Sequence, residues 1–138
     1  ATTAIFHGPH AYVSPTWYAT APAVPTWNYA VVHAAGQAEL QDDDVSALDN
    51  VSTLTRTFEP PVEPWQPVAL PDELRRSLLG AIVAFELRVA RVEAKFKLGQ
   101  NRAPADRRGV IARLEADEGD DSRALAALMR ATLPDDRD

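Results

Sequence analysis

The chain carries no Asp, Glu, Lys or Arg before Glu39, whereas charged residues are frequent from there to the end. The same uncharged segment holds all three His, all three Tyr and two of the three Trp residues. Aromatic and β-branched side chains favour strands. The segment is therefore predicted to form strands, and its aromatic and imidazole groups point to a functional site built mainly at this end of the chain.

Turn-forming residues divide this segment into separate predicted strands. Two short β-rich runs, residues 3–7 and 11–14, are separated by Gly8-Pro9, a dipeptide typical of turns. A further strand is predicted over residues 27–40, with Gly36 as the place of a bulge or bend.

The pattern changes after the third strand. Residues 42–84 predict helices and a proline-rich linker, because helical spacing of apolar residues alternates with a run of prolines. Residues 85–101 predict a long strand whose apolar positions change parity, so a bulge is expected near Ala90-Arg91. Residues 102–133 predict two C-terminal helices, the second capped by Ser122. The apolar spacing predicts the inward residues, which are Val110, Ile111 and Leu114 in the first helix and Leu125, Leu128 and Met129 in the second.

Length and composition narrow the class of protein. At 138 residues the chain is predicted to form a single domain, 1–138, in which residues 1–41 supply the first strands. The absence of cysteine excludes disulfides and thiolate chemistry and fits a cytoplasmic location. A formal net charge of −6 argues against direct DNA binding, which depends on basic residues. No stretch approaches the roughly 20 apolar residues of a membrane span, so no membrane partner is expected.

His7 and His10 are the first candidates for chemistry. Residues three apart on a strand point to opposite faces, so a metal site is not expected. Hydrogen bonding to backbone groups around Gly8-Pro9 is favoured over an acid–base role. No nucleophile–base pair has a nearby carboxylate to orient it, so no catalytic residue is predicted.

Trp17 and Trp27 have two alternative interpretations. They are either ordinary core residues or the flat walls of a ligand pocket. Neutral donors and acceptors lie beside them in the sequence, on Ser14, Thr16, Thr26 and Asn28. Aromatic walls with a few polar groups suit a small heteroaromatic ligand.

Lys95 and Lys97 are the only lysines, and they share one face of the predicted strand. Gln100-Asn101-Arg102 follows at the strand end. These cationic and amide groups could hold a phosphate. The alternative is a solvated strand face on which Glu93 serves as an ionic partner.

Several short sequence motifs rich in uncommon residues are specific enough to compare with known families. They are Phe6-His-Gly-Pro-His-Ala-Tyr-Val-Ser-Pro15, Val24-Pro-Thr-Trp-Asn-Tyr29, and Lys95-Phe-Lys-Leu98 with Gln100-Asn101-Arg102. Through these strings the chain resembles the PaiB family, described as FMN-binding negative transcriptional regulators.

The resemblance implies a mainly β (α+β) fold, an antiparallel split β-barrel of the FMN-binding type with flanking and C-terminal helices. It implies a homodimer that holds FMN non-covalently near the subunit interface. Family members carry further strands ahead of the first motif, so another chain or segment is expected to complete the barrel. The implied cofactor-binding residues are Ser14, Trp17, Thr26, Trp27 and Asn28 for the flavin, and Lys97, Gln100 and Asn101 at the strand end.

The leading functional hypothesis is an FMN-binding regulatory protein of the PaiB type that acts indirectly on transcription. A flavin-dependent oxidoreductase of the split-barrel class is an alternative, because the cofactor itself carries such chemistry. A half-barrel dimerisation module that no longer binds FMN is another.

Overall fold

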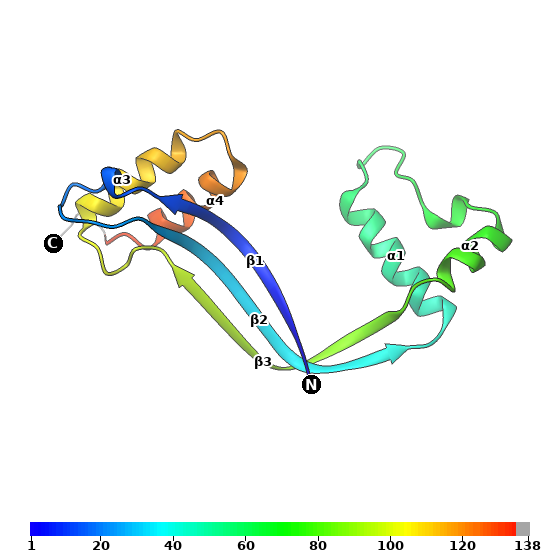
Figure 1. Ribbon diagram of the computed structural model, residues 1–138. Helices are drawn as coiled ribbons and strands as arrows, with labels where there is room; N and C mark the ends of the chain where they lie inside the picture. Colours follow the sequence, from blue (N-terminus) through cyan, green and yellow to red (C-terminus); the bar gives the residue numbers. More distant parts are fainter. Residues whose placement is uncertain (135–138) are drawn as a thin grey trace. The chain divides into compact units, whose positions relative to one another are not determined.

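A computed structural model describes residues 1–134 (Figure 1). Over these residues the chain forms a three-stranded antiparallel sheet, which is not closed, and four α-helices. The α+β class with a split-barrel-like sheet is therefore confirmed. The elements, in chain order, are β1 (Thr2–Val13), β2 (Thr26–Gln41), α1 (Asp44–Phe58), α2 (Asp72–Leu79), β3 (Ala84–Lys97), α3 (Pro104–Glu115) and α4 (Asp120–Ala131).

The sheet order is β1-β2-β3, with β2 in the centre. β1 is one continuous strand, so the prediction of two runs broken at Gly8-Pro9 is wrong. Proline lacks an N–H to donate, and an edge strand tolerates this loss because one of its sides has no partner strand. At Gly8 the neighbouring strand comes close, since an added Cβ would lie 3.2 Å from the Cβ of Ala30.

The contacts within the chain divide it into two compact units. The first, called the α1–α2 unit, comprises Gly36–Ala90 with Ala1–Thr2. The second, called the α3–α4 unit, comprises Thr3–Ala35 and the chain from Arg91 onward. A single domain over residues 1–138 stays a prediction.

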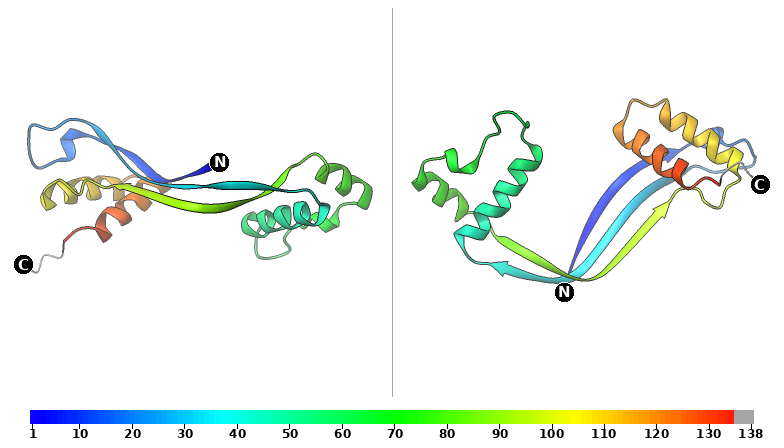
Figure 2. Two further views of the ribbon diagram at one scale, coloured as in Figure 1. Left: turned by 90° about the horizontal axis from the view of Figure 1, so that it is seen from below. Right: turned by 180° about the vertical axis from the view of Figure 1, so that it is seen from behind.

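The α3–α4 unit has the larger core. The two helices lie side by side against the end of β1 and the beginning of β2 (Figure 2). The inward residues predicted for both helices are confirmed as buried, except that Leu128 is partly buried. The buried cluster consists of Ala11, Val13, Leu98, Val110, Ile111, Leu114, Leu125, Ala126 and Met129.

The start of α4 differs from the prediction. Its N-cap is Gly119, and Ser122 lies inside the first turn. The Ser122 hydroxyl donates to Asp117 Oδ2 at 2.7 Å, and the Gly119 N–H donates to Asp117 Oδ1 at 3.2 Å. The carboxylate of Asp117 therefore organises this turn, because it accepts from the N-cap and from the first turn together.

The α1–α2 unit has a small core made of Ala47, Leu79 and Ala84. Asp43 caps α1, its Oδ1 accepting from the Ser46 N–H at 2.8 Å. Gly36 permits a close approach between β2 and β3, because a Cβ there would lie 1.9 Å from the carbonyl oxygen of Arg88.

Candidate functional site

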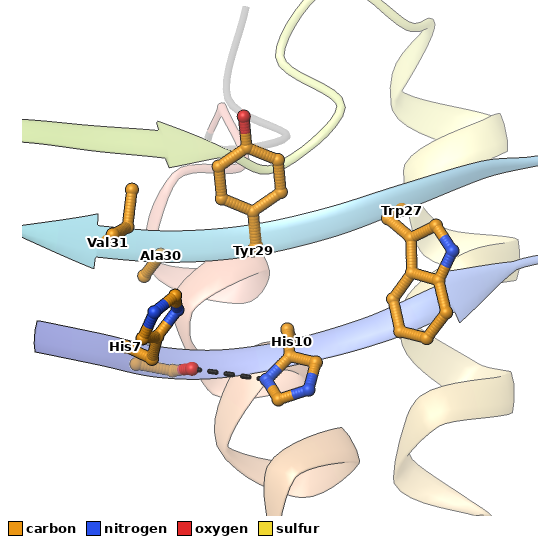
Figure 3. Close-up of a pocket in the computed structure, with 7 residues that line it drawn as sticks. His7, His10, Trp27, Tyr29, Ala30 and Val31 are labelled. Atoms are coloured by element: carbon orange, nitrogen blue, oxygen red, sulfur yellow. Dashed lines mark hydrogen bonds between the residues drawn. The ribbon is translucent and has the colours of Figure 1, made fainter. Parts of the chain in front are cut away.

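An open cavity of about 320 Å³ lies over β1 and β2 within the α3–α4 unit. Its walls are mainly apolar and aromatic, with two imidazoles (Figure 3). We call it the β1–β2 cavity. It is lined by His7, Gly8, His10, Trp27, Tyr29, Ala30 and Val31.

Both His7 and His10 line this cavity, although strict alternation would place them on opposite faces (Figure 3). The expectation of opposite faces is therefore wrong. Gly8 faces Ala30, which is buried, and Ala11 farther along β1 is buried too. Gly8 and Ala11 are an odd number of residues apart, so alternation slips by one residue between them. The slip brings both imidazoles to the same cavity.

The rings around Trp27 form a small aromatic group. The centroids of the His10 and Trp27 rings are 6.0 Å apart with an interplanar angle of 32°. Tyr12 meets Trp27 edge-on at 6.2 Å. Trp27 is 53% exposed, so part of this ring is free to contact a ligand.

His10 is also tied to polar groups through its Nδ1 atom. This atom lies 3.4 Å from the carbonyl oxygen of Gly8 and 3.1 Å from Asp121 Oδ2 in the first turn of α4. An Nδ1–H can donate to either oxygen. The backbone bond is of the kind the sequence favoured, and it coexists with a place in the cavity wall.

A second cavity, of about 420 Å³, is lined by residues of β2 and β3. We call it the β2–β3 cavity. It shares Tyr29 and Val31 with the first cavity, and its other lining residues are His33, Glu93, Ala94 and Lys95. Both volumes fall within the range of about 300–1,000 Å³ that is usual for small-molecule sites.

Trp27 is the residue of the predicted flavin set that reaches the β1–β2 cavity. Ser14 caps the 3₁₀ turn Pro15–Trp17 by accepting from the Thr16 N–H at 3.2 Å. Trp17 packs against the core of the α3–α4 unit. Asn28 is only 3% exposed, and its amide donates to the sulfur of Met129 at 3.4 Å. For every residue of the predicted flavin set, Trp27 included, a role toward a ligand stays a prediction.

The strand-end residues make contacts of their own. Lys97 Nζ donates to Thr26 Oγ1 and, at 2.8 Å, to the carbonyl oxygen of Trp27. The Gln100 side chain folds back, accepting from the Leu98 N–H and donating to the Phe96 carbonyl. Asn101 is exposed in the turn that follows. Lys97 therefore contacts Thr26 of β2, whereas the side chain of Gln100 contacts only the backbone near the end of β3 among the residues described.

Three of the lining residues, Tyr29, Val31 and His33, were not among the predicted site residues. The alternation of a strand could have identified them, because the odd-numbered residues from Trp27 to His33 occupy one face of β2. The buried Asn28 and the other buried even residues of this stretch mark the opposite face.

The loop that follows Trp17 is held to α3 by a buried carboxylate. Asp106 Oδ2 accepts from the Thr20 hydroxyl at 2.6 Å, and Oδ1 accepts from the Thr20 N–H at 2.9 Å. The hydroxyl bond is the largest cause that lowers the pKa of Asp106, and burial acts in the opposite direction. The guanidinium of Arg102 lies over the Tyr18 ring, 4.5 Å from its centroid.

Within residues 1–134, no group of three or more His, Cys, Asp or Glu side chains is arranged to hold a metal ion. In the same part of the chain, none of the helices combines the length and apolar character needed to cross a membrane.

Comparisons with known proteins identify relatives. Residues 1–91 match the family described as "Putative FMN-binding domain". Over 129 residues the chain is 36% identical to the Bacillus subtilis (strain 168) protein named "Protease synthase and sporulation protein PAI 2", covering 94% of this chain and 62% of that protein. It is 31% identical to an uncharacterized protein of Emericella nidulans, covering 91% of this chain and 57% of the relative. It is 30% identical to an uncharacterized protein of Aspergillus fumigatus, covering 78% and 49% respectively.

The chain spans between 49% and 62% of the length of these curated relatives. The family match includes all of β1 and β2 and therefore every lining residue of the β1–β2 cavity. The resemblance to the PaiB family is confirmed, and the chain belongs to the family of FMN-binding domains that matches its residues 1–91.

Proposed function

We propose that this chain is the FMN-binding part of a regulatory protein of the PaiB type. The observation that carries the proposal is the β1–β2 cavity, with the exposed face of Trp27 beside His10. A planar, largely apolar ring needs flat aromatic walls and a few polar groups at its edge. Family membership supplies the identity of the ring.

The residues of the cavity fit an isoalloxazine ring. Trp27 and Tyr29 offer apolar surface, and the imidazoles of His7 and His10 offer ring nitrogens that donate or accept hydrogen bonds. Bound FMN would supply a redox-active ring. The role of this chain's residues is to bind and orient that ring, and no catalytic residue is assigned.

The regulatory role is proposed to be indirect. The net charge of −6 opposes direct contact with DNA phosphates. The sheet of residues 1–134 is not closed, and unpaired strand edges are sites for pairing with another strand. A homodimer, or a further chain or segment that completes the barrel, follows naturally from those edges. A cytoplasmic location is proposed as well.

A flavin titration tests the proposal. FMN is added to the purified chain, and binding is followed by quenching of the flavin fluorescence. We expect saturable binding that Trp27→Leu weakens by about fivefold to 150-fold, because stacking on one aromatic side chain is worth about 1–3 kcal/mol.

The matched control is Trp65→Leu, which removes a partly exposed Trp from the α1–α2 unit. This variant should bind FMN as the unmodified chain does. Absence of FMN binding, or equal losses in the two Trp variants, would contradict the proposed site.

A further inference from the structure

We propose that the β2–β3 cavity, with Lys95 and His33, holds the anionic group of the ligand whose ring occupies the β1–β2 cavity. The inference rests on the proposed function and adds a second subsite to it. Family resemblance placed the strand-end site at Lys97, Gln100 and Asn101, whereas the structure points to Lys95.

The first argument is the distribution of charge on β3. Arg91, Glu93, Lys95 and Lys97 share one face of the strand, giving three cations and one anion within an acidic chain. Glu93 Oε1 accepts from Arg91 Nη1 at 3.1 Å, so its charge is met by a neighbour on the same strand. The face as a whole therefore attracts an anion.

The second argument separates the two lysines. Lys97 Nζ already donates to Thr26 Oγ1 and to the Trp27 carbonyl. Within residues 1–134, the Lys95 ammonium makes no hydrogen bond or ion pair, and Lys95 lines the β2–β3 cavity. Lys95 can therefore direct all three of its N–H donors to a ligand. Lys97 is a positioning residue, because it fixes the backbone that carries the Trp27 ring.

The third argument is the continuity of the two cavities. Tyr29 and Val31 line both of them, so a ligand that passes over these side chains enters the second cavity from the first. Neighbouring strands lie about 4.8 Å apart, which separates β1 from β3 by about 10 Å across β2. A flat ring carrying a short chain with a terminal phosphate spans such a distance. His33 adds a ring nitrogen at the anionic end.

The test compares FMN with riboflavin, which has the same ring and no phosphate. Dissociation constants are measured for both ligands with the unmodified chain, Lys95→Gln and Lys97→Gln. Lys95→Gln should weaken FMN binding by about tenfold and change riboflavin binding by less than about twofold, because a charge-assisted hydrogen bond is lost for FMN alone. Lys95→Arg should restore most of the FMN affinity.

Lys97→Gln is the matched control, since it removes the same charge from the same strand face two residues away. It should weaken FMN and riboflavin by equal factors, because it disturbs the ring wall. A loss confined to FMN in Lys97→Gln, or equal losses of both flavins in Lys95→Gln, would overturn the assignment.

A measurement without flavin keeps the inference separate from the proposed function. Phenyl phosphate is titrated into the chain while the His33 ring protons are observed by NMR. We expect shifts that saturate in the unmodified chain and are absent in Lys95→Gln. His33 signals that do not respond to phenyl phosphate would overturn the subsite, whereas a failure to bind FMN with intact His33 shifts would overturn only the flavin assignment.

Discussion

Asp106 shows how one side chain ties a loop to a helix. Its pKa is held below the ordinary 3.8, first by the Thr20 hydroxyl and also by backbone N–H groups and Arg102. A lowered pKa in the folded state means that the ionised carboxylate stabilises the fold. This stabilisation is complete above the ordinary value and is lost as the pH falls through the lowered one.

We therefore expect Asp106→Asn to lower the free energy of unfolding at neutral pH, with a smaller further loss on acidification than in the unmodified chain. An amide presents at most one acceptor oxygen to the two donors of Thr20. Urea unfolding at neutral pH and at several values below pH 3.8 measures both effects. Asp49→Asn, at an exposed site in α1, is the control. Parallel stability–pH curves for the unmodified chain and Asp106→Asn would contradict this.

At the scale of elements, Arg107 of α3 secures the end of α4. The side chain is 4% exposed, and its guanidinium donates to the carbonyl oxygens of Met129 at 3.0 Å and Thr132 at 2.8 Å. The last carbonyls of a helix lack partners within it. We expect Arg107→Met to destabilise the chain by at least about 2 kcal/mol, because buried acceptors lose their donor.

The control for this prediction is Arg130→Met. Arg130 pairs with Glu115 between the same two helices, but both side chains are substantially exposed. Its loss should cost less than about 1 kcal/mol. Chemical unfolding measures the free energy of unfolding of both variants. Equal destabilisation would show that the contacts of Arg107 with the end of α4 stabilise the chain no more than an exposed ion pair does.

The elements themselves were largely predictable. β2 and β3 lie close to their predicted bounds because β-branched and aromatic runs coincide with alternation. The inward faces of α3 and α4 followed from the helical period. The predicted break at Gly8-Pro9 is absent because β1 is an edge strand, which tolerates the missing N–H of proline. The prediction of Ser122 as a cap failed because α4 already begins at Asp120, and the Ser122 hydroxyl donates to Asp117 instead of accepting from a backbone N–H.

At the scale of the whole molecule, the two units differ in core size. Among residues 1–134, the buried apolar cluster of the α3–α4 unit contains nine residues, and that of the α1–α2 unit contains three. Local opening requires less free energy where fewer apolar contacts are lost. We expect the backbone amides of α1 and α2 to exchange with solvent faster than those of α3 and α4. Hydrogen exchange followed by NMR measures this, and uniform protection across the four helices would refute it.

The sequence by itself determined most of the elements, the helix faces that form the larger core, and the family, because each of these depends on local pattern or on motifs of uncommon residues. Only the tertiary structure decided which functional groups meet. The meeting of His7 with His10 depends on a one-residue slip in β1, and the contact between Lys97 and Thr26 joins residues 71 positions apart. Periodicity describes one element at a time, so it could not reveal that Lys97 is engaged while Lys95 remains available to a ligand.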